Sequence, residues 1–207
     1  WRRALEMLET DPIFQAAEVA NLADLQDLDE LLGDDIDEVF RARASKLFKN
    51  LSSGHKIVLL TITRLVETVA ERTLVLLDEP EAHLHPPLLS AFVRALSDLL
   101  VDRNGVAIIA THSPVVLQEV PRTCVWKVRR AGKEVNAERP AIETFGENVG
   151  VLTREVFGLE VTHSGFHRLL RESVEQFDDY DDVLDHFEGE LGAEGKAIAR
   201  SLLIADE

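Results

Sequence analysis

The sequence predicts an α/β fold with parallel core strands, flanking helices and helical extensions at both ends. Two short apolar runs, residues 73–77 and 106–111, have the length and composition of strands in the centre of a parallel sheet. Between them lie residues 86–105, an amphipathic segment that begins with two prolines and ends with Asn-Gly, as a crossover helix does. Because parallel strands need such a crossover, the order strand, helix, strand indicates an α/β unit.

The segments before the first strand are expected to be helical. Within residues 1–50, leucines recur at three- and four-residue steps among aspartates and glutamates, which predicts amphipathic helices. A break is expected at Gly33, with a restart capped by Asp34 or Asp35. Residues 56–71 suit a largely buried helix that leads into the first strand.

The segments after the second strand predict a hairpin and then helices. Residues 122–138 alternate on either side of Arg-Ala-Gly-Lys, which is typical of a hairpin or of two edge strands. Cys124 alternates in step with Trp126 and Val128, so a buried strand position is expected for it. Helical patterns run from residue 140 to the end, with breaks near three positions: Gly165, residues 178–182 and Gly192.

Charge divides the chain into three parts. The formal net charge of −16 is concentrated in residues 1–50 and 141–207, whereas residues 51–140 are near neutral. We expect a helical segment over 1–50, an α/β lobe over 51–140 and an acidic helical extension over 141–207. An acidic surface repels nucleic acid, so any contact with DNA or RNA is expected to be local or indirect.

Composition indicates a globular protein of a reducing compartment. The 207 residues, 45% of them hydrophobic and 29% charged, suffice for one sizeable core or two small domains. We find no signal peptide and no apolar run near the roughly 20 residues that a membrane helix needs, so a cytoplasmic location without membrane contact is expected. A single cysteine excludes an internal disulfide. The start at Trp1 rather than Met suggests a fragment.

Three polar motifs mark candidate chemistry. Asp78 and Glu79 end the first apolar run, and His112 follows the second, so all three are expected at the sheet edge where α/β proteins bind ligands. Residues 51–55, Leu-Ser-Ser-Gly-His, open the preceding helix and offer hydroxyls and free N–H groups to an anion. Taken singly, the motifs also fit an acidic turn, a turn histidine and an ordinary serine N-cap.

The order and spacing of these motifs resemble the C-terminal half of an ABC-class ATPase of the RecF/SMC/OLD-like AAA type. The three elements resemble, in turn, its signature motif, Walker B strand and switch histidine. DEPEAHLHP is similar to the Walker B and D-loop region of OLD-like AAA ATPases. LSSGHKIVLLTITRLVE and ETFGENVGVLTREVFGLEV look closest to the PtuA ATPase of Septu antiphage systems, some of which accompany retrons. The resemblance covers about residues 45–170.

The resemblance implies an ATP site shared between two protomers. Asp78 would assist Mg²⁺, Glu79 would be the catalytic carboxylate, and His112 would contact the γ-phosphate. The signature-like motif would contact the γ-phosphate of an ATP held mainly by the opposite protomer, through Ser52, Ser53, Gly54 and His55. Two ATP molecules would thus join a head-to-tail dimer that closes on ATP and opens after hydrolysis.

The chain departs from the family pattern in two places. The family's Leu-Ser-Gly-Gly-Gln is here Leu-Ser-Ser-Gly-His, which keeps the serine, one glycine and the helix N-terminus. No Walker A motif is present, because neither Gly132-Lys133 nor Gly195-Lys196 has the required preceding glycine or the following Ser or Thr. This piece alone is therefore expected to bind ATP poorly, with the P-loop in an upstream segment.

Glu81, His83 and His85 raise a metal alternative, since His-x-His with a nearby carboxylate can ligate zinc or iron. The prolines around them argue for a loop, so we favour a role for these three residues at the dimer interface. An independent metallohydrolase is kept as a further hypothesis.

Two surfaces carry open alternatives. Basic side chains near the hairpin could touch a phosphate backbone or deter strand pairing: Arg122, Lys127, Arg129, Arg130 and Lys133. Residues 177–190 place aromatic and leucine side chains at helical spacing among aspartates. They fit either a solvated helix packed on its own domain or a docking arm for a partner.

We therefore expect an ATP-binding and ATP-hydrolysing module that forms homodimers or higher oligomers and regulates an associated nuclease in antiphage defence. By the Septu resemblance the partner would be an HNH nuclease, and no HNH or TOPRIM motif occurs in these residues. The alternatives are a non-catalytic ABC-fold scaffold and a DNA repair or maintenance ATPase of the RecF/SMC type.

Overall fold

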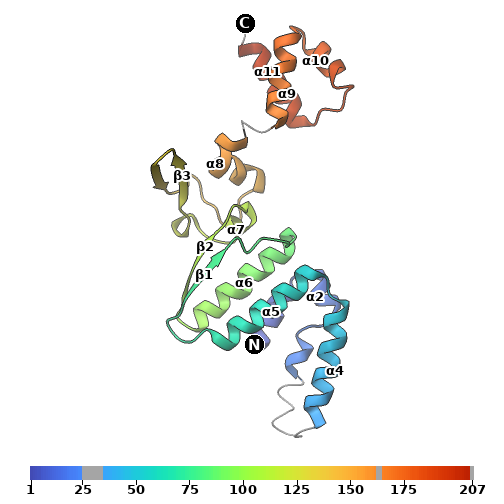
Figure 1. Ribbon diagram of the computed structural model, residues 1–207, viewed down its shortest axis with the longest axis vertical. Coiled ribbons are helices and arrows are strands. Elements are labelled where there is room, and N and C mark those ends of the chain that lie inside the picture. The colour runs from blue at the N-terminus through green and yellow to red at the C-terminus, as the bar shows by residue number, and fades with distance from the viewer. Residues whose placement is uncertain (25–34, 162–164, 206–207) are drawn as a thin grey trace. The chain divides into compact units, whose positions relative to one another are not determined.

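The computed structural model describes residues 1–24, 35–161 and 165–205. They belong to two compact units, Trp1–Val149 and Gly150–Glu207, which are taken separately below. Helices predominate, and the first unit contains a small parallel sheet (Figure 1). The predicted mixed α/β class is confirmed at this level.

The first unit follows the predicted order of elements. Its members are α1 (Arg2–Leu8), α2 (Pro12–Ala16), α4 (Asp35–Asn50), α5 (Ser53–Thr68), β1 (Leu74–Asp78), α6 (Pro86–Asp102), β2 (Val106–Ala110), α7 (Pro114–Gln118), the 3-10 helix η1 (Arg122–Cys124), β3 (Lys127–Ala131) and β4 (Glu134–Glu138). The positions of the helix before β1, of both strands, of the crossover helix and of the hairpin are thus confirmed. The expected burial is not: α5 buries only one side, with Ile57 and Leu60 45% and 58% exposed, and both strands alternate between covered and exposed residues. The expected break at Gly33 lies outside the described residues.

Helix starts in this unit are set by polar caps followed by proline. Asp11, His85 and Ser113 cap α2, α6 and α7, and a proline follows each cap at the first helical position. Ser52 caps α5 without a proline. Ser52 and His85 are also candidate residues from the sequence analysis, so the local rules that begin α5 and α6 position these side chains as well.

The parallel sheet places the ends of β1 and β2 side by side. The register pairs Leu74 with Val106 and continues to Asp78 with Ala110. The backbone N–H of Glu79 then donates to the carbonyl of Ala110 over 2.8 Å, which extends the alignment past the strand end. The residues that follow β1 and β2 are therefore held at one edge, as the sequence predicted.

One face of this sheet is covered and the other is open. The side chains of Val75, Leu77, Ala107 and Ile109 pack with those of α5 and α6 in one apolar cluster. A second cluster joins α1, α2, α5 and α6 around side chains that include Leu5, Leu8, Phe14, Val58, Ile62, Leu88 and Phe92.

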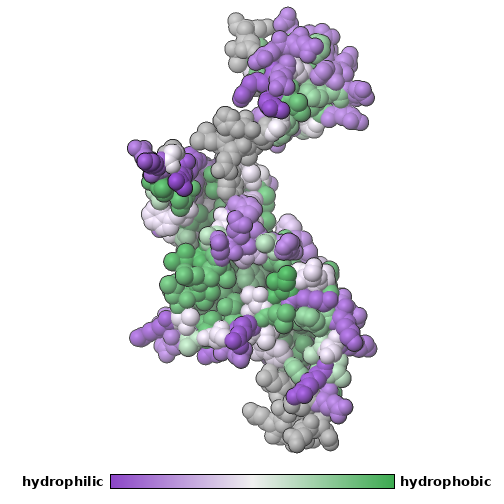
Figure 2. Space-filling model, in the orientation of Figure 1, coloured by the Kyte–Doolittle hydropathy of each residue, from purple (hydrophilic) through white to green (hydrophobic). Residues whose placement is uncertain are grey.

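The open face is apolar. Four large side chains on it are 53 to 68% exposed: Leu74, Leu76, Val106 and Ile108. The space-filling view shows a broad hydrophobic area over these strands (Figure 2). Parallel sheets are normally covered on both faces, so this face is unusual for a parallel sheet.

The hairpin corrects one sequence expectation. β3 and β4 pair antiparallel from Lys127 with Glu138 to Ala131 with Glu134. Cys124 is exposed at the end of η1 instead of buried in a strand, and Trp126 and Val128 are exposed with it. Val125 and Lys127 are the buried residues of this stretch, so the alternation has the opposite phase.

The second unit is helical, with α8 (Val149–Val161), α9 (Gly165–Gln176), α10 (Tyr180–His186) and α11 (Ala193–Ala205). Its core comprises Leu170, Val174, Val183 and Ala199. Phe177, Tyr180 and Phe187 pack against that core, which supports the interpretation of residues 177–190 as a helix packed on its own domain. Across the described residues, no helix is both long and apolar enough to cross a membrane.

Candidate functional site

The edge at the carboxyl ends of β1 and β2 brings the predicted catalytic residues together. The Nδ1 atom of His112 lies 3.6 Å from Oε1 of Glu79, and both side chains are more than half exposed. Glu79 has a backbone φ of +44°, a left-handed conformation that costs about 1 kcal/mol for a non-glycine residue. Asp78 is the exposed last residue of β1. Two carboxylates and an imidazole therefore face solvent at one place.

Glu81 fixes the geometry of this edge. Its Oε1 atom accepts hydrogen bonds from the Thr111 hydroxyl over 2.7 Å and from the His112 backbone N–H over 2.9 Å. The same oxygen lies 3.2 Å from Nδ1 of His112, and the Glu81 side chain is only 10% exposed. Glu81 thus ties the segment after β1 to the end of β2.

These contacts lower the pKa of the Glu81 carboxyl. Burial raises the pKa of its carboxyl, but the hydrogen bonds from Thr111, from its own backbone and from His112, with the charge of His112, outweigh burial and hold the pKa below its usual value. Glu81 therefore stays ionised and can hold His112 in place. The sequence analysis had considered Glu81 as a metal ligand and favoured an interface role for it, and that role stays a prediction.

The signature-like motif lies at the N-terminus of α5. The hydroxyl of Ser52 accepts the backbone N–H of His55 over 3.4 Å and lies 2.6 Å from His55 Nδ1. Gly54 is buried, and a Cβ atom there would lie 2.9 Å from the carbonyl oxygen of His83. The glycine is therefore needed for the close approach of α5 to the segment between β1 and α6.

His55 leads to an acidic residue that the sequence motifs did not reveal. Its ring is 1% exposed, packs edge-on against Phe14, and places Nε2 3.0 Å from Oδ1 of Asp11. Asp11 is fully buried and caps α2 by accepting the backbone N–H groups of Ile13 and Phe14 on the same oxygen. An Asp-Pro pair signals a helix cap, but nothing in the sequence signals its partner.

His85 completes this buried group. Its Nε2 atom lies 3.7 Å from Oδ2 of Asp11, and its side chain is 46% exposed. Ligand atoms of Asp11, His55 and His85 all lie within 4.8 Å of one another, so their spacing would admit a metal ion. However, Nδ1 of His85 accepts the backbone N–H of Leu88, so Nε2 of the neutral ring carries the hydrogen and offers no lone pair. We therefore interpret the group as a hydrogen-bonded Asp11–His55 pair with His85 beside it at 3.7 Å.

The structure does not form the metal site that the sequence raised as an alternative. Among the residues that the structure describes, Glu81, His83 and His85 do not gather their ligand atoms in one group. His83 has a backbone φ of +67° and meets Gly54 through its carbonyl. The segment from Glu79 to His85 thus connects the Ser52 motif with the Glu79–His112 edge.

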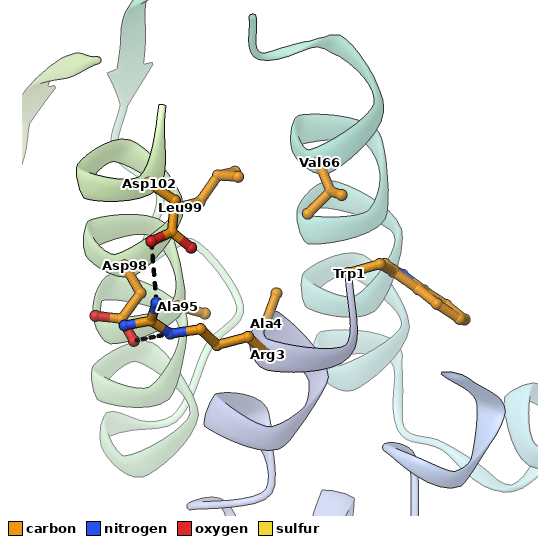
Figure 3. Close-up of a pocket in the computed structure, with 8 residues that line it drawn as sticks. All are labelled: Trp1, Arg3, Ala4, Val66, Ala95, Asp98, Leu99 and Asp102. Carbon is orange, nitrogen blue, oxygen red and sulfur yellow. Dashed lines mark hydrogen bonds and ion pairs between the residues drawn. The ribbon is translucent and has the colours of Figure 1, made fainter. Parts of the chain in front are cut away.

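A small pocket lies away from these motifs. It lies between α1, α5 and α6, where Arg3 bonds Asp102 over 2.9 Å and approaches Asp98 at 3.7 Å (Figure 3). The remaining lining residues are Trp1, Ala4, Val66, Ala95 and Leu99. No residue of the motifs lines it, so it belongs to the packing of the first unit.

Sequence comparison gives the class of the protein. The family model described as "AAA domain, putative AbiEii toxin, Type IV TA system" matches residues 2–118, and the chain belongs to this AAA-domain family. The match runs from α1 to α7 and includes every residue of the site. The predicted kinship to AAA/ABC-like ATPases, a class of nucleotide-binding domains, is confirmed at the level of the family.

A particular relative extends the match over the whole chain. The chain is 51% identical over 213 residues to Protein ea59 of Escherichia phage lambda. The alignment covers 99% of this chain and 40% of that protein. The chain therefore spans about two fifths of the length of this relative.

Proposed function

We propose that the complete protein is an ABC-type ATPase that binds ATP with Mg²⁺, dimerises around it and hydrolyses it. The observation that carries the proposal is the joint placement of Glu79 and His112 at adjacent strand ends, held by the partly buried Glu81. In this arrangement a carboxylate and an imidazole converge on a space open to a phosphate group. The family match supports a nucleotide as the ligand.

Each residue then has a role set by its chemistry. Asp78, an exposed carboxylate at the strand end, fits a Mg²⁺ ligand, and the ion would neutralise phosphate charge. Glu79 would orient or deprotonate the attacking water, and His112 would donate to the γ-phosphate. The motif at the start of α5 would serve a nucleotide bound by the second protomer, through Ser52, Ser53, Gly54 and His55.

We extend the proposal to the partner. By the resemblance of LSSGHKIVLLTITRLVE and ETFGENVGVLTREVFGLEV to the Septu ATPase, the dimer would control an HNH-type nuclease in antiphage defence within the cytoplasm. Nucleic acid would be reached through that partner, because the chain itself carries a net charge of −16. His83 and His85 would lie near the dimer interface.

ATP turnover by the full-length protein tests the catalytic assignment. Glu79→Gln removes the carboxylate charge at constant size and should lower turnover by about 100-fold or more, while MgATP still binds. The exposed Glu175 of α9 offers a matched control, and Glu175→Gln should turn over ATP as the wild type does. Equal turnover in the wild type and in Glu79→Gln would refute the assignment.

A second candidate is a non-catalytic ABC-fold scaffold. It is favoured by one observation, the absence of a GxxxxGK[ST] stretch from these 207 residues. If the full-length protein binds no MgATP and still assembles with its partner, the scaffold takes the place of the ATPase.

A further inference from the structure

The hydrogen bonds of Ser52 and His55 define where the hydroxyl proton of Ser52 points. Oδ1 of Asp11 is an acceptor, so the Nε2 atom of His55, 3.0 Å away, carries the hydrogen. In the neutral ring Nδ1 is then the acceptor. In that state Ser52 donates its hydroxyl hydrogen to Nδ1 over 2.6 Å, while its oxygen accepts the backbone N–H of His55.

This arrangement conflicts with phosphate binding. Phosphate oxygens are acceptors, so Ser52 must turn its single hydroxyl hydrogen toward the phosphate to bind it. Nδ1 of His55, whose ring is 1% exposed, would then be a buried acceptor without its donor, which costs free energy. The other neutral tautomer does not help, because its Nε2 lone pair would face the Asp11 carboxylate.

Protonation of His55 removes the conflict. The imidazolium ring donates from Nε2 to Asp11 and from Nδ1 to the oxygen of Ser52, and the Ser52 hydroxyl is then free to donate to phosphate. On the assumption of the function proposed above, we propose that the His55 ring is neutral in the free protein and that γ-phosphate binding at Ser52 takes up one proton from solvent onto its Nδ1 atom. Asp11 and His55 are thus positioning residues for the Ser52 hydroxyl.

The surroundings of His55 can accept a positive charge on its ring. Asp11 faces the ring with a fully buried carboxylate, and among the described residues its Oδ2 has no hydrogen-bond partner. His85 approaches that oxygen at 3.7 Å from the start of α6. The N-terminus of α5 opposes a positive ring. The buried carboxylate and the arriving phosphate, both anionic, offset that opposition.

Calorimetry with MgATP tests the proton uptake. All samples are full-length protein carrying Glu79→Gln, so that the nucleotide is retained, and each is titrated at one pH in two buffers of different ionisation enthalpy. With His55 intact we expect about one proton more per bound nucleotide than with His55→Gln, whose amide donates to Ser52 without taking up a proton. With Ser52→Ala, which removes the hydroxyl, the same proton should be lost.

Two controls isolate this proton from others. His186→Gln, at an exposed histidine of α10, should keep the parent count. MgADP, which lacks the γ-phosphate, should show no difference between the parent and His55→Gln. The affinity of the parent for MgATP should also fall by about tenfold more per unit rise in pH than that of Ser52→Ala, over the range in which free His55 is neutral.

The outcomes separate the two proposals. If the parent binds MgATP and the proton count is the same in the parent, His55→Gln and Ser52→Ala, the proton link is wrong and the ATPase stands. If the parent binds no MgATP, the proposed function itself fails, and the proton link fails with it. Ser52 is exposed, so Ser52→Ala tests the proton link even if substitution of the buried His55 prevents folding.

Discussion

Asp11 and His55 lie 44 positions apart in the sequence, yet Nε2 of His55 stands 3.0 Å from Oδ1 of Asp11, and both side chains are buried. This contact joins the start of α2 to the start of α5. The other ring nitrogen of His55, Nδ1, lies 2.6 Å from the hydroxyl oxygen of Ser52. A stability element and a candidate phosphate contact are therefore one hydrogen-bonded chain.

Substitutions of Asp11 should reveal the strength of this contact. Asp11→Ala removes the cap of α2 and leaves Nε2 of the buried His55 without its partner, and should lower the free energy of unfolding by about 3 kcal/mol. Asp11→Asn keeps an oxygen for the cap and for His55, and should cost only about 1 kcal/mol. Urea denaturation of both variants measures the difference. Equal losses would show that the charge, and not the shared oxygen, carries the stabilisation.

Gly54 should tolerate no side chain. A Cβ atom at this position would lie 2.9 Å from the His83 carbonyl oxygen, which is backbone and cannot swing away. Gly54→Ala should therefore destabilise the protein by about 1–3 kcal/mol, measured by thermal unfolding.

Gly158 provides the matched comparison for Gly54. It lies inside α8, where the nearest atom that an added Cβ would meet among the described residues is Cγ of Arg154, at 4.0 Å. Because alanine is the better helix former, Gly158→Ala should raise the free energy of unfolding by about 0.5–1 kcal/mol. A loss of stability in Gly158→Ala as large as in Gly54→Ala would contradict the steric explanation.

The ionised Glu81 should make the free energy of unfolding depend on pH in the acidic range. Because its pKa is lowered in the folded protein, its contribution is fully present above the unfolded value near 4.5 and is lost as the pH falls through the lower folded value. Glu81→Gln should cost about 1 kcal/mol at neutral pH, since the amide oxygen still accepts from Thr111 and His112 without the charge. The stability difference between wild type and Glu81→Gln should shrink below about pH 4.5; a difference that stays constant into acid would contradict the assignment.

Much of the fold was predictable because its signals are local in the sequence. The two apolar runs predicted β1 and β2. Because the strands were expected to be parallel, Asp78, Glu79 and His112 were expected at the same edge of the sheet, as the structure has them. The prolines at 86–87 and the serine at 52 likewise indicated the starts of α6 and α5. Each of these features can be predicted from residues that are neighbours in the sequence.

Three features were not predictable because they depend on contacts between distant residues. The sequence marks Asp11 as a cap but not as the partner of His55. Glu81 gains its role only when β2 brings Thr111 within reach. The exposed Cys124 was wrongly placed because Lys127, which the alternation assigned to solvent, is buried and pairs with Glu138 over 3.2 Å.

The open sheet face yields the last prediction. Leu76 is 68% exposed in the middle of β1, although parallel sheets are normally covered on both faces. The aligned region makes up 40% of the relative from phage lambda, and we predict that this face is covered in the full-length protein. Leu76→Lys should then place an unpaired charge in a buried site and lower the free energy of unfolding of the full-length protein by about 3 kcal/mol or more.

Val101 supplies the control for Leu76. It is 74% exposed at the end of α6, away from the open face, so Val101→Lys should change stability by less than about 0.5 kcal/mol. Urea denaturation of the two full-length variants makes the comparison. If Leu76→Lys is as neutral as Val101→Lys, the face stays open in the complete protein. A large loss confined to Leu76→Lys means that the sheet is completed by another part of the molecule, because a lysine in water at this position would cost almost nothing.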